Sequence, residues 1–184
     1  MKKHKTQRLD KILASSGYGS RKDVKKLIKS GQVSVNGVIV NDAGCQVNPS
    51  VNQIIVAEEY LTYRKNIYIM LNKPVGVISS TRDNVEITVI DLLLGEYSHR
   101  KLFPVGRLDK DAQGLIFLTD DGNIAHRLLS PKNRVDKTYY VEVRGKLNKG
   151  DVEAFAQGIE LEDFTTLPAT LDILESGDIS QAYV

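Results

Sequence analysis

Apolar positions in the first thirty residues recur at the spacing of α-helices and predict two short helices. The first covers residues 8–15. The second begins after Ser20, which is a suitable N-cap because Asp23 stands three residues later in the capping-box position, and Gly31 is well placed to end it. The apolar positions that set this pattern are Leu9, Ile12, Leu13, Val24, Leu27 and Ile28.

A β-hairpin is predicted directly after these helices. Residues 33–40 form two short β-branched runs on either side of Asn36-Gly37. An Asn-Gly pair between such runs is the strongest local hairpin signal, because a type I′ turn needs two successive positive φ angles.

The remainder of the chain mixes strands and helices without a strict βαβ rhythm. This pattern favours an α+β fold with a largely antiparallel sheet. Residues 57–66 have mixed charge and no clear period, so we interpret them as a linker between an N-terminal domain, residues 1–56, and a second domain, residues 67–184. The predicted strands are 67–71, 77–80, 101–105, 115–118 and 138–143, and the predicted helices are 88–94, 123–129 and 151–157.

The net charge of +2 conceals a strong polarity along the chain. Residues 1–30 hold ten Lys or Arg and two Asp, whereas residues 151–184 hold eight Asp or Glu and no basic residue. A basic front of this kind indicates a polyanionic partner, which the acidic end of the chain is not expected to contact.

Composition excludes several classes of protein. No run of about 18 apolar residues occurs, which argues against a membrane span, and no apolar stretch follows the basic N-terminus as in a secretory signal. The single Cys45 cannot form an internal disulfide, and His4, His99 and His126 lack metal-ligand spacing. We expect a soluble cytoplasmic protein without a metal site.

Residues 106–115 carry the candidate chemistry. A glycine turn presents Arg107 and Asp109 on a loop between two predicted strands, and a carboxylate held there beside a guanidinium is reactive rather than structural. Two other interpretations exist. Residues 109–120 imitate a calcium-binding loop, although an apolar strand pattern follows and the twelfth residue is Asp120 rather than glutamate. Asp109 with Asp111, or Asp120 with Asp121, could be the paired carboxylates of a hydrolase.

The front of the chain, about residues 8–55, resembles the RNA-binding module named after ribosomal protein S-four. Two short helices followed by a hairpin, with the second helix basic, carry this resemblance. It implies that basic side chains face RNA phosphates, contacts that position RNA without reading its sequence. A solvated lysine face on an ordinary surface helix is the alternative. The residues concerned are Arg8, Arg21, Lys22, Lys25 and Lys26.

Five segments in order resemble the motifs of pseudouridine synthases, in the branch that modifies small-subunit ribosomal RNA. They are residues 70–76, 106–115, 118–122, Ser130-Pro131 and 137–139. The first, which contains Lys73, has a structural role in the family, and we expect Lys73 itself to be a solvated loop residue. The resemblance covers about residues 67–170.

The resemblance also implies roles for individual residues. Asp109 is the expected catalytic carboxylate, attacking either the ribose anomeric carbon or the uracil ring so that the base can detach, rotate and rejoin through carbon 5. Arg107 is expected to occupy the place of the flipped uridine or to contact the backbone, and Tyr139 to stack on the uracil and assist proton removal. No cofactor or metal is required. The expected partner is ribosomal RNA, with no DNA or membrane, and the protein is expected to be a monomer.

The chain departs from the family pattern at two places. Ala112 stands where the family usually has threonine. After residues 182–184 the family continues with a basic, glycine-containing segment that pairs with the catalytic aspartate, so we expect the catalytic domain to be truncated at its C-terminus and its sheet to end in an unpaired edge. A catalytically inactive RNA-binding paralogue or a fragment is therefore the rival interpretation.

Overall fold

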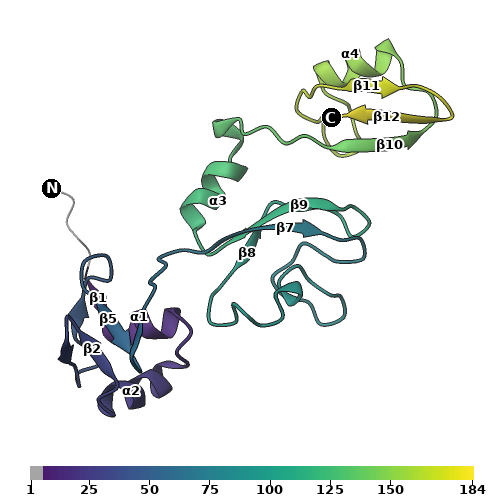
Figure 1. Ribbon diagram of the computed structural model, residues 1–184. Helices are drawn as coiled ribbons and strands as arrows, with labels where there is room; N and C mark the ends of the chain where they lie inside the picture. Colours follow the sequence, from purple (N-terminus) through teal and green to yellow (C-terminus); the bar gives the residue numbers. More distant parts are fainter. Residues whose placement is uncertain (1–5) are drawn as a thin grey trace. The chain divides into compact units, whose positions relative to one another are not determined.

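Short strands and helices mix throughout the part of the chain that the computed structural model describes, residues 6–184 (Figure 1). The strand pairings within each sheet are antiparallel, which confirms the predicted α+β class. Two compact units are present: one ends at Asn133 and the other comprises Arg134–Val184. His4 and the basic residues before residue 6 lie outside the described part.

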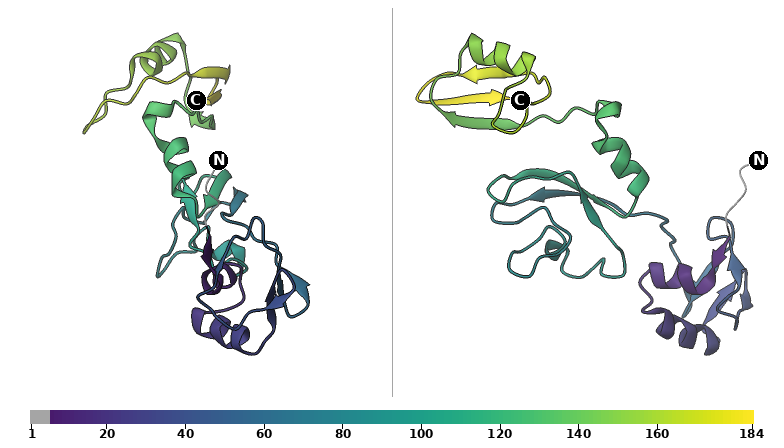
Figure 2. Two further views of the ribbon diagram at one scale, coloured as in Figure 1. Left: turned by 90° about the vertical axis from the view of Figure 1, so that its left-hand side faces the viewer. Right: turned by 180° about the vertical axis from the view of Figure 1, so that it is seen from behind.

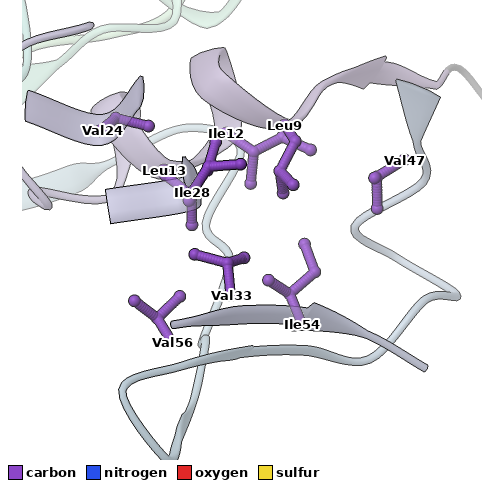
Figure 3. Close-up of a cluster of buried hydrophobic side chains, with 9 residues drawn as sticks. All are labelled: Leu9, Ile12, Leu13, Val24, Ile28, Val33, Val47, Ile54 and Val56. Carbon is purple, nitrogen blue, oxygen red and sulfur yellow. The ribbon is translucent and has the colours of Figure 1, made fainter. Parts of the chain in front are cut away.

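The N-terminal module packs two helices on a small sheet. Strands β3, β2, β5 and β6 are neighbours in that order, while β1 pairs with β4. Side chains from both helices point toward the strands around a buried apolar cluster of nine residues (Figure 3). The elements are β1 Gln7–Arg8, α1 Leu9–Ser15, α2 Arg21–Lys29, β2 Val33–Val35, β3 Val38–Ile39, β4 Gln46–Val47, β5 Ile54–Val56 and β6 Glu59–Tyr60.

The local signals in this module are confirmed. The Ser20 side chain accepts a hydrogen bond from the backbone N–H of Asp23, and the Asp23 carboxylate accepts one from the backbone N–H of Ser20, completing the capping box at the start of α2. Strands β2 and β3 form the predicted hairpin, with φ of 51° at Asn36 and 79° at Gly37.

The linker between the N-terminal module and the rest of the chain is shorter than predicted. Strand β6 pairs with β5, and Leu61 and Tyr63 pack against the apolar cluster of the module. Residues 59–63 therefore belong to the N-terminal module. A two-residue strand is too short to show a period, and its pairing depends on β5, so the sequence alone did not indicate it.

A three-stranded sheet forms the other part of the first unit, with β9 between β7 and β8. Val77, Val89, Ile116 and Leu118 form its buried cluster. The predicted strand at 77–80 is wrong: that segment makes only a single bridge between Ile78 and Thr88. The elements are β7 Tyr68–Lys73, η1 Asp91–Leu93, β8 Phe103–Val105, β9 Gly114–Thr119, α3 Gly122–Leu129 and η2 Pro131–Asn133.

The C-terminal unit contains a second three-stranded sheet and the helix α4, and Figure 2 shows it from two further sides. The elements are β10 Tyr140–Arg144, α4 Lys149–Gln157, β11 Asp172–Glu175 and β12 Ile179–Tyr183. Strand β12 lies between β10 and β11 and pairs with both. The last strand is therefore central in its sheet, and the two edges belong to β10 and β11, because sequence order does not determine a strand's neighbours.

Candidate active site

The loop between β8 and β9 carries the candidate catalytic residues. Strand β8 ends at Val105 and β9 begins at Gly114, so residues 106–113 form the connection at one end of the sheet. Gly106 opens the loop with φ of 92°, a conformation that favours glycine. Side chains beyond this turn project from a loop fixed on two strands, which is a common position for catalytic groups.

The carboxylate of Asp109 is exposed and lines an open pocket of about 390 Å³. This volume lies within the usual range of small-molecule pockets, about 300–1,000 Å³. Among residues 6–184, no hydrogen bond or ion pair to this carboxylate is found. Asp109 is therefore an accessible acid rather than a helix cap or a member of a surface ion pair.

Arg107 is exposed in the same pocket as Asp109, so the structure brings these two predicted residues together. Tyr139 belongs to the C-terminal unit. It lies just before β10 and is 42% exposed. Its backbone N–H donates to the carbonyl of Val184 at 2.8 Å, and its own carbonyl accepts from Val184 at 2.9 Å, so the chain is anchored while the ring remains accessible.

The first motif segment holds the backbone of the signature loop. The carbonyl of Lys110 accepts a hydrogen bond of 2.7 Å from the backbone N–H of Gly76 and a longer one, 3.5 Å, from the ammonium of Lys73. The same ammonium donates to the carbonyls of Val77 at 2.7 Å and Pro74 at 3.0 Å. These contacts fix the residue directly after Asp109.

Lys73 is fully buried, so the expectation of a solvated loop residue is wrong. A buried ammonium needs hydrogen-bond partners, and the loop carbonyls supply them. A signal was available: Ile69 and Leu71 lie on the inward face of β7, and Lys73 continues the same period-2 pattern.

An ion pair also links the signature loop to the segment before η1. The Lys110 ammonium lies 2.8 Å from the carboxylate of Glu86. Both side chains are substantially exposed, so this pair contributes little to stability, and its effect is to restrict the Lys110 side chain at the pocket edge.

The basic residues of the N-terminal module have two different environments. Arg21, Lys22, Lys25 and Lys26 are exposed on α2, as a phosphate-binding face requires. Arg8 is also exposed, but its guanidinium donates two hydrogen bonds, of 3.0 and 2.8 Å, to the buried carboxylate of Asp10.

The two alternative interpretations of the acidic residues fail on this geometry. Residues 109–120 run into strand β9 rather than between two helices, so the calcium-loop interpretation is wrong, and no group of three or more His, Cys, Asp or Glu able to hold a metal occurs in the described part. Asp120 pairs with Arg100 at 2.8 Å, and Asp121 caps α3, so these two carboxylates are already engaged.

Asp121 also accepts a hydrogen bond of 2.8 Å from the Tyr68 hydroxyl, which, together with its backbone contacts at the start of α3, lowers its pKa from the ordinary value. An ionised cap of this kind has a structural role. Asp111 is exposed but does not line the pocket that contains Asp109, so the paired-carboxylate arrangement gains no support there.

The family model described as RNA pseudouridylate synthase matches residues 67–176, and the S4 domain model matches residues 7–52. The chain belongs to the RNA pseudouridylate synthase family. The predicted family and its S-four-like N-terminal module are thereby confirmed, and the protein is a pseudouridine synthase, an isomerase. The small-subunit branch stays a prediction.

Individual relatives agree with the family. The uncharacterized RNA pseudouridine synthase YtzG of Bacillus subtilis is 46% identical over 90% of this chain and 70% of its own length. Ribosomal large subunit pseudouridine synthase B of the same organism is 38% identical over 91% of this chain and 68% of its own length. A solved pseudouridylate synthase is 35% identical, with a TM-score of 0.54, and the match covers 95% of this chain and 76% of that one.

No helix in residues 6–184 is long and apolar enough to cross a membrane.

Proposed function

We propose that this protein converts a uridine in ribosomal RNA to pseudouridine, with Asp109 as the catalytic carboxylate. The observation that carries the proposal is the environment of Asp109 within the family signature: an exposed acid, without a hydrogen-bond or ion-pair partner in the described part, on a fixed loop at a pocket. An acid that must reach a nucleoside has to be accessible, and this one is.

Asp109 acts on a uridine that has left its base stack. It forms a bond to the anomeric carbon of the ribose or to the uracil ring, the glycosidic bond breaks, and the base rotates and rejoins through carbon 5. Arg107, which shares the pocket, occupies the vacated position in the RNA or contacts its backbone.

Tyr139 stacks on the flipped uracil and assists removal of the proton from carbon 5. Its exposed ring and anchored backbone are compatible with this role. Residues 67–184 constitute the catalytic part of the chain in this proposal, and the N-terminal module is a separate RNA-binding part.

The N-terminal module holds the RNA through its phosphates. The exposed face of α2 supplies Arg21, Lys22, Lys25 and Lys26, and the unpaired edge of the Arg8 guanidinium adds a further donor. We place the protein in the cytoplasm, where ribosomal RNA is accessible before assembly is complete. We expect it to act as a monomer.

Small-subunit RNA, which the motif resemblance implies, is the first candidate substrate. Large-subunit RNA is the second, because a relative that is 38% identical is named for the large subunit.

The test uses the full chain and separate small- and large-subunit transcripts carrying tritium at carbon 5 of uridine. Pseudouridine formation releases this tritium to water, so release from one transcript identifies the substrate, and chemical mapping then locates the uridine. Binding to a transcript with tritium release from neither would overturn the proposal and favour the inactive RNA-binding paralogue.

A further inference from the structure

A serine outside the signature loop makes a two-point contact with it. The hydroxyl of Ser79 donates a hydrogen bond of 2.7 Å to the carbonyl of Leu108 and accepts one of 2.9 Å from the backbone N–H of the same residue. Leu108 directly precedes Asp109, so one side chain holds both polar backbone groups of the neighbouring residue.

Ser79 is itself firmly placed. Ile78, the residue before it, accepts a hydrogen bond of 3.0 Å from Val89 and donates one of 3.0 Å to the carbonyl of Ile87. Val77 is buried in the apolar cluster that also contains Val89. The burial of Val77 and the backbone hydrogen bonds of Ile78 thus fix the main chain that leads to Ser79. They thereby fix the position from which the Ser79 hydroxyl extends.

The same two contacts limit what else this hydroxyl can do. A serine hydroxyl has one proton to donate, and here the Leu108 carbonyl receives it. Although Ser79 lines the pocket with Asp109, it has no second proton to offer a uracil or a ribose. Its contribution is therefore directed to the loop and not to a bound nucleoside.

We propose that Ser79 is a positioning residue for the reaction, which sets the orientation of Asp109 by fixing Leu108. This inference rests on the proposed function of Asp109. With Gly76 and Lys73 holding the Lys110 carbonyl, the backbone is restrained on both sides of the acid. Such restraint matters because a small misplacement of a reacting group costs up to roughly a hundredfold in rate.

The test compares Ser79→Ala with Ser79→Thr, which keeps the hydroxyl, in the full chain. Ser176→Ala is the matched control, since its hydroxyl donates to the Leu147 carbonyl at 2.7 Å in the C-terminal unit. We expect Ser79→Ala to lower kcat for tritium release roughly tenfold to a hundredfold at unchanged KM. Ser79→Thr should restore most of the rate, and Ser176→Ala should match the wild type.

Amide hydrogen exchange supplies a measurement that does not require activity. The peptide containing Leu108 and Asp109 should exchange faster in Ser79→Ala than in the wild type, with exchange in the N-terminal module unchanged. If the wild type never releases tritium but Ser79→Ala still exchanges faster, the contact between Ser79 and Leu108 is supported and only the proposed function of Asp109 is rejected.

Three results would overturn the inference. Unchanged exchange at Leu108 in Ser79→Ala would show that the contact does not restrain the loop. A rise in KM without a fall in kcat would assign Ser79 to substrate binding. A Ser79→Thr variant as slow as Ser79→Ala would show that the hydroxyl is not what matters.

Discussion

At the scale of single residues, Lys73, which contacts the signature loop, and Lys110, which lies within it, have opposite environments. Lys73 is fully buried and its ammonium is bound by backbone carbonyls. Lys110 is exposed and pairs with Glu86 at the surface. The first is part of the framework that supports the loop, while the second is a minor contributor to stability, because water competes for exposed ion pairs.

Replacing Lys73 should therefore destabilise the protein. In Lys73→Ala, the carbonyls of Val77 and Pro74 lose their donor and a buried cavity remains, so we expect a loss of about 2–4 kcal/mol in the free energy of unfolding. Urea denaturation measures it. Lys110→Ala is the control and should change the value by less than about 0.5 kcal/mol. Equal effects of the two substitutions would contradict the proposed environment of Lys73.

The hydrogen bonds between Arg8 and the buried carboxylate of Asp10 predict that the stability of the protein depends on pH. The Arg8 guanidinium, through its hydrogen bonds, holds the pKa of Asp10 below the ordinary value of 3.8, although burial of the carboxyl acts in the opposite direction. A lowered folded-state pKa contributes stability above the unfolded value, and this contribution is lost as the pH falls through the folded value.

We therefore expect Asp10→Asn to melt at a lower temperature than the wild type at pH 7, and the difference to shrink as the pH falls below about 4. Thermal unfolding from pH 7 to pH 2.5 measures this. Glu59→Gln, which alters an exposed carboxylate of the same module, should leave the difference small at every pH. A constant gap between wild type and Asp10→Asn would reject the linkage.

At the scale of elements, helices α2, α3 and α4 begin at side chains that satisfy free backbone N–H groups. Ser20 and Asp23 cap α2, Asp121 caps α3, and Asn148 with Asp151 forms a capping box at α4. Helices of eight or nine residues are marginal in isolation, so their caps and their buried faces determine whether they form.

Ser20→Ala should lower the free energy of unfolding by about 1 kcal/mol, because the backbone N–H of Asp23 loses its acceptor. Chemical denaturation followed by helix circular dichroism measures the change. Ser50→Ala, on an exposed turn of the same module, provides the control and should have no measurable effect. If the two variants are indistinguishable, the cap does not stabilise the module.

The sequence was informative at this scale where the signal was local. The Ser20 capping box and the Asn36-Gly37 turn depend on residues within a few positions of each other, and both occur as expected. The signature loop was located for the same reason, since its two glycines and the flanking strands are contiguous in the chain.

Interactions between distant segments were not accessible from pattern alone. The pairing of β10 with β12 and the contact of Ser79 with Leu108 each join residues that are far apart in sequence, whereas β6 was missed because a two-residue strand shows no period. The burial of Lys73 was missed for another reason: a lysine beside a proline ordinarily indicates a solvated turn, although the period-2 pattern of β7 places Lys73 on the inward face. The relation of Tyr139 to Asp109 stays a prediction.

At the scale of the whole molecule, charge separates along the chain. The ten basic residues of the first thirty contrast with an acidic last segment, residues 151–184. A polyanionic RNA is attracted to the first and repelled by the second. We therefore expect the N-terminal module to contribute most of the salt-dependent binding.

Changing Lys22, Lys25 and Lys26 together to Ala should weaken RNA binding and reduce the slope of log affinity against log salt by about 2–3, one counterion release per lost contact. Filter binding across a salt series measures both. The control, Lys132, Lys146 and Lys149 changed to Ala, removes the same charge outside the module. An equal reduction in slope for the two triple variants would assign the effect to net charge alone.

Asp109→Asn, assayed for tritium release and for RNA affinity on the same preparation, shows whether this carboxylate is the catalytic group. We predict that release falls to background, while the affinity for the transcript stays within about twofold of the wild type, since the proposed phosphate contacts lie in the N-terminal module. Asp111→Asn should retain both. Release by Asp109→Asn at the wild-type rate would contradict the assignment of this carboxylate as the catalytic group.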